Sequence, residues 1–388
     1  MISSVVLLTF VFLALLTHIG SIMAVIGRSW LKSVNKAQAD ELAAGGVTIV
    51  RPVSQADDFI SKTLESTFQL NCNKLEIIFC AARESDPAVK TVRDLIKAYP
   101  NHRATLLIGT ANISQNPKLN NCVKGWQAAS NDLVALVDSN VILPPDYLAQ
   151  MLGVWDEGCG MVTSPPVGAE PASFWAEVEC AFLNTHQARW QLIADQLGSG
   201  FAQGKNLLFR KSILEPLGGI ACLAAEPAED AAATKALRCA GYHIRLAKFP
   251  FEQPLGVRTM SEFWHRQVRW AKLRRATFPL HYLPEIASGI AMPLIALTTA
   301  LSLLGINLAA PLFLLAALWY GLEILLALTM HWQASTLSPF AMIMRDLLLP
   351  LVWLAGFGDK QFKWQGHQMT AIQQAPDGTF ANGAKQLI

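Results

Sequence analysis

Charge is what this sequence lacks most. Only 15% of its 388 residues are Asp, Glu, Lys or Arg, while 52% are hydrophobic and the mean hydropathy is +0.31. That balance is too apolar for an ordinary soluble protein of this size, and it predicts one domain of ordinary size combined with membrane segments. The net charge of +2 is too small to indicate a charged partner, and we expect no nucleic acid among the partners.

Two familiar motifs are also missing. The seven cysteines are odd in number and include no C-x-x-C pair, so we expect reduced thiols in a cytosolic compartment and no zinc site. A phosphate-binding loop is absent because Gly204-Lys205 is followed by Asn206 rather than Ser or Thr. The Gly-rich segment 198–205 remains a candidate for closing over a ligand.

Charge is completely absent from residues 1–27. Within them, Val5 to Ile26 is long enough to cross a hydrocarbon core of roughly 30 Å. Arg28, Lys32 and Lys36 follow, so the positive-inside rule predicts an external N-terminus and a cytoplasmic domain after this segment. A cleaved signal peptide is the weaker alternative, since no basic region precedes the apolar run and that run is too long.

A second apolar region predicts two antiparallel spanning helices, at about 284–304 and 308–330, joined by a turn at Gly305-Ile306-Asn307. Glu323 lies inside the second helix. An intramembrane carboxylate is a functional candidate in principle. Because Glu323 is near a helix end, we favour the simpler interpretation that it reaches the membrane interface.

A third apolar segment, Phe340 to Phe357, contains Arg345 and Asp346 side by side. It either spans the membrane, which would place the tail from Asp359 outside, or lies along the surface, which would leave the tail in the cytoplasm. The sequence leaves both possibilities open. Residues 362–366 fit a lipid-surface anchor and a short strand equally well.

Strand-like and helix-like runs alternate from Val47 to about Lys248. This order predicts a mostly parallel sheet with right-handed crossovers, in which ligands bind beyond the carboxyl ends of the strands. The expected strands cover residues 47–50, 75–80, 104–108 and 133–137, and the expected helices cover 57–68, 88–99, 122–129, 173–196 and 231–240.

Acidic residues follow two of these strands. Asp138, in Asp138-Ser139-Asn140, directly follows the fourth strand, where a carboxylate can hold Mg²⁺ or Mn²⁺ that also binds diphosphate oxygens. A turn or helix cap is the alternative, because Pro144-Pro145 follows closely. Asp86 lies past the second strand and fits either a contact with a nucleotide base or ribose, or an Asp-Pro turn.

Two further candidates lie on expected helices. Glu229-Asp230 begins the helix over 231–240, where acidic residues are usually N-caps. The functional alternative is a general base that removes a proton from an acceptor hydroxyl. His186 lies in the long polar helix over 173–196, and a lone histidine there is usually structural or surface-exposed.

A cationic segment with an aromatic residue borders the second apolar region. Arg266, Arg269 and Trp270 are followed at once by Lys272, Arg274 and Arg275. Such a segment can lie at an anionic membrane surface or hold the diphosphate of a nucleotide-sugar donor. Together with the carboxylates, it predicts an enzyme that moves a sugar from a cytosolic donor to a membrane lipid.

The order of these motifs resembles the inverting membrane glycosyltransferases with a GT-A fold, and most of all the ceramide glucosyltransferases. The similarity spans about residues 47–285 and the flanking membrane segments. The matching segments are Asp86-Pro87, Asn116 to Asn121, Asp138-Ser139-Asn140, Glu229-Asp230, and Arg266-x-x-Arg269-Trp270 with its continuation to Arg274.

The resemblance implies a role for each site residue. Asp86 would contact the uracil or ribose of a UDP-sugar, Asp138 would ligate Mg²⁺ or Mn²⁺, and Asp230 would be the catalytic base. Arg266, Arg269 and Trp270 would bind the diphosphate and line the path of the acceptor, and His186 would help to place donor or acceptor. The metal motif departs from the Asp-x-Asp of many relatives, since it has a single carboxylate.

The resemblance also implies a fold, a location and a set of regions. We expect a GT-A domain with membrane helices on both sides, in a bacterial inner membrane, with the catalytic domain in the cytoplasm. The regions are an N-terminal transmembrane helix (1–27), the GT-A domain (28–260), an amphipathic interfacial segment (261–283), C-terminal membrane segments (284–358) and a tail (359–388).

Other interpretations of the sequence share some of these expectations and differ in the acceptor or in the activity. The sugar is most simply glucose and the acceptor ceramide, but a hopanoid or a glycerolipid also offers a hydroxyl at the membrane surface. A processive polysaccharide synthase shares the Arg-x-x-Arg-Trp motif, although the short chain and few membrane segments disfavour a polymer pore. A non-catalytic membrane protein with a transferase-like domain is disfavoured because all three carboxylates and both arginines are present.

Overall fold

The computed structural model describes residues 2–371 except 32–33, 56 and 365–366. The chain forms two compact units, each built from separate stretches of sequence. The helical unit comprises Met1–Lys32, Val167–Ile193 and Pro254–Gly358, and the sheet unit comprises Ser33–Pro166, Ala194–Gln253 and Asp359–Ile388. Residues 28–32, 167–193 and 254–260, which we expected within the GT-A domain, therefore group with the apolar helices.

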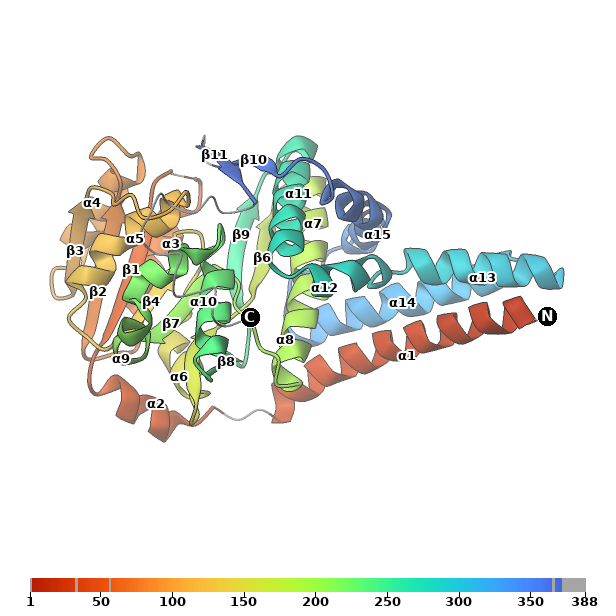
Figure 1. Ribbon diagram of the computed structural model, residues 1–388, viewed down its shortest axis with the longest axis horizontal. Helices are drawn as coiled ribbons and strands as arrows, with labels where there is room; N and C mark the ends of the chain where they lie inside the picture. Colours follow the sequence, from red (N-terminus) through yellow and green to blue (C-terminus); the bar gives the residue numbers. More distant parts are fainter. Residues whose placement is uncertain (1, 32–33, 56, 365–366, 372–388) are drawn as a thin grey trace. The chain divides into compact units, whose positions relative to one another are not determined.

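A seven-stranded sheet forms the centre of the sheet unit, in the order β3-β2-β1-β4-β7-β5-β8 (Figure 1). The first four of these strands are parallel to one another, while β7 is antiparallel to both β4 and β5. The expected parallel sheet is thus present, with one reversed strand. The strands are β1 (Val47–Val53), β2 (Leu75–Ala81), β3 (Arg103–Ile108), β4 (Leu133–Val137), β5 (Cys159–Thr163), β7 (Asn206–Arg210) and β8 (His243–Leu246).

Every residue of β1, β2 and β4 is buried, as is typical of parallel strands covered on both faces. Their Val, Ile, Leu and Phe side chains form the main hydrophobic core. Strand β1 is longer than expected and includes Pro52. The proline is tolerated because β4 pairs only with Val47–Val50, which leaves one side of the end of β1 without a neighbour.

Short helices connect and cover the strands, and they end close to where the sequence predicts them. The expected helix over 57–68 divides into α3 and a 3₁₀ turn, and the expected helix over 122–129 starts earlier, at Pro117. The sheet-unit helices are α2 (Lys36–Ala43), α3 (Ile60–Glu65), η1 (Ser66–Gln69), α4 (Ala88–Ala98), α5 (Pro117–Ala128), α6 (Tyr147–Leu152), α9 (Lys211–Leu214), η3 (Glu215–Leu217), η4 (Gly219–Ala225) and α10 (Glu229–Cys239).

Two small sheets complete the strands. Strands β10 (Gln361–Trp364) and β11 (His367–Thr370) pair antiparallel, so the segment after residue 360 forms a strand, one of its two expected structures. Gln365 and Gly366 lie outside the described residues. Strands β6 (Pro166–Pro171) and β9 (Phe251–Gly256) form the other pair.

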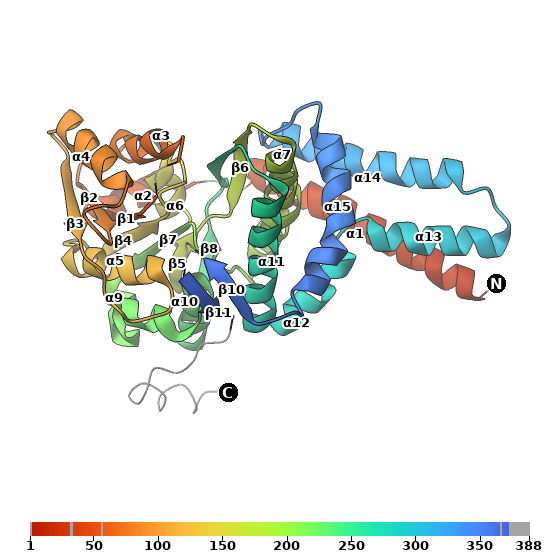
Figure 2. The same ribbon diagram turned by 90° about the horizontal axis from the view of Figure 1, so that it is seen from above.

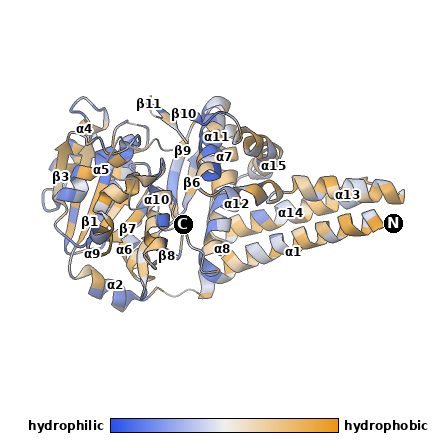
Figure 3. Cartoon of the chain, in the orientation of Figure 1, coloured by the Kyte–Doolittle hydropathy of each residue, from blue (hydrophilic) through white to orange (hydrophobic). Residues whose placement is uncertain are grey.

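The helical unit contains the long apolar helices α1 (Ile2–Leu31), α13 (Ala291–Leu304), α14 (Ala309–Thr329) and α15 (Ser338–Ala355). Among the described residues, α1, α14 and α15 are each long and apolar enough to cross a membrane. Figures 1 and 2 show α1 beside the hairpin of α13 and α14, and hydrophobic residues follow all three helices in Figure 3. The apolar segments of the sequence are therefore helices, as predicted.

The beginning of the second apolar region differs from the prediction. The sequence predicts one helix from about residue 284, but the chain forms α12 (Pro279–Tyr282) and η5 (Leu283–Ala287) before α13 begins. The segment 279–287 is bent by 48° relative to α13. If the two are counted as one broken span, they form a fourth candidate membrane span among the described residues. The expected turn between α13 and α14 is present, with Gly305 in the left-handed conformation (φ 70°) that glycine adopts without strain.

The expected polar helix over 173–196 is mostly buried and is not uniform. It consists of α7 (Phe174–Ala181), a π-helical segment (Phe182–Ala188) and α8 (Arg189–Gln196). A π-helical segment is rare and is frequently found at functional sites. The arginine motif lies on α11 (Met260–Thr277), which begins with a capping box between Thr259 and Glu262.

Candidate active site

Two of the predicted carboxylates lie beyond one edge of the sheet. Asp86 follows β2 and Asp138 follows β4, and β1 lies between these two parallel strands. Two strand spacings separate the strand ends by about 10 Å. The parallel topology therefore brings both residues to the carboxyl edge, where ligands bind in open α/β sheets.

Asp138 is held by two lysines. Its Oδ1 lies 2.6 Å from Lys118 Nζ, and its Oδ2 lies 3.0 Å from Lys205 Nζ. Lys205 Nζ also donates to Asn140 Oδ1 at 3.2 Å. Burial by itself would raise the pKa of Asp138, but the two lysines lower it below its usual value. Asp138 is therefore a carboxylate that stays ionised in a cationic setting.

Lys118 was not among the residues picked from the sequence. It lies in the first turn of α5, which begins at Pro117 and is capped by the Asn116 side chain accepting from Lys118 N and Leu119 N. Asparagine at the N-cap followed by proline is a strong helix-start signal, and it would have placed Lys118 at a helix N-terminus.

Glu229 is joined to Asp138 through the same lysine. Lys118 Nζ lies 2.5 Å from Glu229 Oε1, and Asn116 Nδ2 donates to Glu229 Oε2 at 2.6 Å. Glu229 is buried at the first position of α10, where the helix dipole favours a negative charge. The structure thus brings together two of the predicted acidic sites through Lys118.

Asp230 follows Glu229 and has a different electrostatic setting. Burial and the neighbouring Glu229 raise the pKa of Asp230 to about 7, although Lys118 opposes the shift. One of its oxygens accepts from Ala231 N at 2.8 Å. A carboxylate with a pKa near neutrality has the proton affinity that a general base needs.

The Gly-rich segment 198–205 lies against these carboxylates. A Cβ atom added at Gly204 would lie 2.7 Å from Glu229 Oε1 and 3.4 Å from Asp230 Oδ2. The Gly204 carbonyl also accepts a hydrogen bond from Lys118 Nζ. Glycine at this position therefore permits the close approach of the backbone to the acidic pair.

Asp138 and Asn140 form an oxygen donor set that fits a hard divalent cation. Both side-chain oxygens already contact one cationic group, the Lys205 ammonium. Carboxylate and amide oxygens are the ligands that Mg²⁺ and Mn²⁺ prefer. With one carboxylate, the remaining ligands would have to come from a bound diphosphate or from water.

A second group of possible metal ligands, Asp156, Cys159 and His243, lies elsewhere in the sheet unit. The Asp156 carboxylate is occupied by an ion pair with Arg245 and by a 2.6 Å contact with His243 Nε2. Burial raises the pKa of the Cys159 thiol to about 12, which disfavours the thiolate that binds metals. This group is accordingly an ion-pair cluster rather than a metal centre.

Asp86 forms a turn of its own. Its Oδ2 accepts from Arg83 N at 3.0 Å and its Oδ1 lies 3.5 Å from Arg83 Nε. The side chain is largely buried and lines an open surface pocket of about 420 Å³ with residues of α4, including Lys90 and Arg93. The Asp-Pro turn foreseen as the alternative is present, and it leaves the nucleoside role of Asp86 as a prediction.

The arginine motif lies in the helical unit, where a buried carboxylate anchors it. Arg266 Nη2 lies 3.0 Å from Glu179 Oε1, and Glu179 on α7 is fully buried. The Arg266 guanidinium also lies 5.3 Å from the centre of the Trp270 ring, at cation–π distance. Burial and Arg266 lower the pKa of Arg269 to about 10, and Glu179 opposes this. Glu179 could not be found from the sequence, because an acidic residue within an expected polar helix gives no signal.

His186 is buried in the π-helical segment rather than exposed. Its Nε2 lies 2.8 Å from Ser288 Oγ, while its Nδ1 has no hydrogen-bond partner among the described residues. Burial lowers the pKa of His186 well below its usual value, and Arg345, Arg189 and Arg274 lower it further. His186 is therefore a neutral imidazole with one nitrogen available.

Comparison with known proteins finds relatives of the family that the motifs resemble. Over 236 residues, 60% of this chain, it is 32% identical to ceramide glucosyltransferase 1 of Caenorhabditis elegans, covering 51% of that protein. It is 26% identical over 329 residues to ceramide glucosyltransferase 3 of the same organism, covering 83% of this chain and 72% of the relative. The chain thus spans only about half the length of the first of these relatives.

Solved structures show the fold. A mannosyltransferase of Pyrobaculum calidifontis, solved with GDP-mannose and Mn²⁺, superimposes with a TM-score of 0.53 at 16% identity, covering 88% of this chain and 99% of that chain. The expected GT-A fold with apolar helices at both ends is confirmed. The model of glycosyl transferase family 21 matches residues 13–375, which confirms the resemblance to the ceramide glucosyltransferases. The chain belongs to glycosyl transferase family 21.

Proposed function

We propose that this protein is a membrane hexosyltransferase that moves glucose from UDP-glucose to a hydroxyl group of ceramide, with inversion at the anomeric carbon. The observation that carries the proposal is Asp230, a partly buried carboxylate whose pKa is raised to about 7, beside Glu229, which Lys118 joins to Asp138 at the end of β4. Membership of family 21 and the names of the relatives support the lipid acceptor.

Asp230 would act as the general base. It takes the proton of the acceptor hydroxyl as the oxygen attacks the anomeric carbon, and UDP leaves from the opposite face. A single displacement of this kind inverts the anomeric configuration. Electrostatic repulsion from Glu229 raises the pKa of Asp230, which makes Asp230 a stronger base.

Cationic groups would stabilise the departing diphosphate. Lys118 and Lys205 provide two ammonium groups next to Asp138, and fixed charges of this kind act without reorganising during the reaction. A bound Mg²⁺ or Mn²⁺, held by Asp138 and Asn140, would neutralise further charge on the phosphates. Arg266, Arg269 and Trp270 are proposed to bind the diphosphate as well, and Glu179 would orient Arg266.

The membrane supplies the acceptor. The helices α1, α14 and α15 are long and apolar enough to hold the protein in a bilayer, where ceramide is also located. We place the sheet unit on the cytoplasmic side of a bacterial inner membrane, because basic residues follow the first apolar helix. UDP-sugars are then available to the sheet unit from the cytosol.

The test is a transfer assay with purified protein in detergent and Mg²⁺ or Mn²⁺. UDP-glucose, UDP-galactose and UDP-N-acetylglucosamine are each offered with ceramide, diacylglycerol and a hopanoid polyol. We expect glucosylceramide with the inverted configuration. Product only on the hopanoid or the glycerolipid would keep the chemistry and replace the acceptor, while UDP binding without any product would indicate a non-catalytic protein.

An Asp230→Asn variant tests the base. We expect a rate about 10²- to 10⁴-fold lower with unchanged UDP affinity, because general base catalysis is usually worth that much. Glu226→Gln is the matched control, since Glu226 precedes the same helix but pairs with Lys235 rather than Lys118. Full activity of Asp230→Asn would exclude Asp230 as the base.

A further inference from the structure

A cluster of buried charges lies among the apolar helices of the helical unit. We define the charge cluster as Arg189 on α8, Glu323 on α14, and Arg345 and Asp346 on α15, none more than 2% exposed. Glu323 is thus buried against arginines of two other helices, Arg189 and Arg345, and its expected place at the membrane interface stays a prediction. The cluster contains two guanidinium groups and two carboxyl groups.

Contacts within the charge cluster are short and directional. Arg345 binds Glu323 through both terminal nitrogens, at 2.7 and 3.1 Å, and its Nε donates to Asp346 Oδ1 at 2.9 Å. Arg189 Nη1 lies 3.7 Å from Glu323 Oε1. Buried ion pairs give little net stability, but they favour one arrangement of the groups around them.

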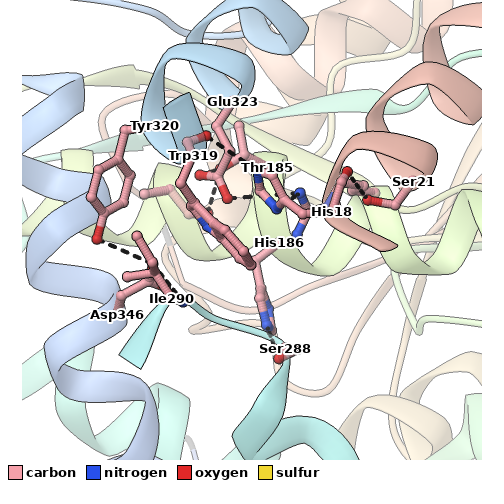
Figure 4. A network of polar contacts seen from close by, with 12 residues as sticks. His18, Ser21, Thr185, His186, Ser288, Ile290, Trp319, Tyr320, Glu323 and Asp346 are labelled. Atoms are coloured by element: carbon pink, nitrogen blue, oxygen red, sulfur yellow. Dashed lines mark hydrogen bonds and ion pairs between the residues drawn. The ribbon is translucent and has the colours of Figure 1, made fainter. Parts of the chain in front are cut away.

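The N-terminal helix α1 joins the charge cluster through His18. Arg189 Nη1 donates to His18 Nδ1 at 3.1 Å, and arginine cannot accept, so this ring nitrogen carries no proton. His18 Nε2 therefore carries the hydrogen and donates to the Trp319 carbonyl at 3.1 Å. The His18 ring also stacks on Trp319, with ring centres 3.7 Å apart (Figure 4). The contact fixes α1 to α8 and α14.

The charge cluster holds the π-helical segment through Thr185. Arg345 Nη1 donates to Thr185 Oγ1 at 2.8 Å, and the Thr185 hydroxyl lies 3.1 Å from Glu323 Oε2 and 3.3 Å from the Ala181 carbonyl. Arg345 Nη1 also lies 3.5 Å from that carbonyl. These contacts fix the π-helical segment at Thr185, the residue directly before His186.

The same cluster holds the other side of His186. Asp346 Oδ2 accepts from Ile290 N at 3.4 Å and from Tyr320 Oη at 3.3 Å, which fixes the loop containing Ser288 (Figure 4). The Ser288 hydroxyl donates to the Glu285 carbonyl at 2.5 Å, so its oxygen accepts from His186 Nε2. His186 Nδ1 is then the unprotonated nitrogen, buried and without a hydrogen-bond partner among the described residues.

We propose that the charge cluster is a positioning device which fixes Thr185 and the Ser288 loop, so that His186 presents its unprotonated Nδ1 to a polar hydrogen of the lipid acceptor. The proposal rests on the proposed function for the identity of that acceptor. It makes α1 a part of this device as well as a membrane anchor, because His18 accepts a hydrogen bond from Arg189.

The experiment compares Thr185→Val, which removes the hydroxyl at nearly constant volume, with Thr185→Ser, which keeps it. Kinetics with each substrate varied, and UDP affinity by calorimetry, are measured on the full chain in nanodiscs. We expect Thr185→Val to lower kcat/KM for the lipid about 10- to 100-fold, since small misplacements have effects of that size, with UDP affinity unchanged. Thr185→Ser should restore most of the loss.

Thr17→Val is the matched control. Thr17 bonds the carbonyl four residues before it, as Thr185 does, but it is exposed on α1. Equal acceptor kinetics in Thr185→Val and Thr17→Val would overturn the proposal. Equal losses in Thr185→Val and Thr185→Ser, or a parallel loss of UDP affinity, would also overturn it by indicating a general folding defect.

His18→Phe tests the part assigned to α1. Phenylalanine keeps a ring for stacking on Trp319 but offers Arg189 no nitrogen, so we expect a loss in acceptor kcat/KM of about 10-fold. Acceptor kinetics equal to those of the wild type would overturn the role of α1.

A readout without turnover separates this proposal from the proposed function. Solid-state NMR of ¹⁵N-histidine protein identifies the His186 signals by their absence in His186→Ala. We expect one tautomer with Nδ1 unprotonated in the wild type, and a second population in Thr185→Val. Absence of wild-type transfer would overturn the proposed function alone, whereas a protonated Nδ1, or the same single tautomer in both proteins, would overturn the positioning role.

Discussion

At the scale of single residues, the pairing of charges decides the chemistry of the candidate site. Asp138 and Glu229 share Lys118, whereas Asp230 has its pKa raised by burial and by Glu229. Carboxylates in different environments take different roles: Asp138 stays ionised at neutral pH, while Asp230 can accept and release a proton there.

The acid limb of the pH–rate profile should report Asp230. A base must be unprotonated, so kcat/KM should rise as the pH increases through about 7 and level off above it. Lys118 lowers the pKa of Asp230, so Lys118→Met should raise it and move the limb to higher pH. Steady-state rates from pH 5 to 9 measure both.

Lys205→Met is the control for that measurement. Burial, Glu229 and Lys118 shift the pKa of Asp230, whereas Lys205 contacts Asp138 and Asn140, so Lys205→Met should lower the rate without moving the limb as Lys118→Met does. A limb that stays in place in Lys118→Met would show that another group controls the profile.

At the scale of elements, close packing of α5 on the sheet sets the position of the cationic site. Gly125 allows this packing, because an added Cβ would lie 2.5 Å from Val50 on β1 and 2.7 Å from the Cys80 sulfur on β2. The first turn of the same helix carries Lys118. The distance between α5 and the sheet therefore governs where Lys118 meets Asp138.

Gly125→Ala should destabilise the protein although alanine favours helices by about 1 kcal/mol. The methyl group would overpack the helix against β1 and β2, at a typical cost of about 1–3 kcal/mol. We expect a lower Tm and a lower rate. Gly321→Ala on α14, where the added atom meets nothing within 4 Å, is the control, and an unchanged Tm for Gly125→Ala would contradict the packing argument.

At the scale of the whole molecule, the chain leaves and re-enters each unit. Residues 167–193 and 254–358 join the N-terminal helix in the helical unit, although the intervening residues belong to the sheet unit. Segments distant in sequence thus complete one another, as α1 does by bringing His18 to Arg189. The two units are therefore interleaved along the sequence rather than arranged one after the other.

The membrane topology can be measured on the whole chain. We expect an alkaline phosphatase fused before residue 1 to be active outside the inner membrane, and one inserted at the Lys36–Ala43 helix to be inactive, because basic residues remain inside. A fusion after residue 388 would decide whether α15 spans the membrane. Phosphatase activity of the fusion at Lys36–Ala43 would show that the protein has the opposite orientation in the membrane.

The sequence alone determined the features that depend on local composition and period. Long uncharged runs predict membrane helices, buried Val- and Ile-rich runs predict parallel strands, and carboxylates at strand ends predict a ligand-binding edge. For this reason Asp138 could be singled out, whereas Asp230 was chosen through the family resemblance, and the fold class was right. The start of α5 differs from the predicted one, although Asn116-Pro117 is a local signal of a helix start.

Only the tertiary structure decided which charges neutralise one another. Lys118 and Glu229 are 111 residues apart, and Glu179, Arg345 and His18 find their partners on other helices. Ion pairs need no sequence period, and a charged residue looks the same in a sequence whether it faces water or a partner. The cost of burying a charge without a partner selects these pairings once the helices and strands have packed together.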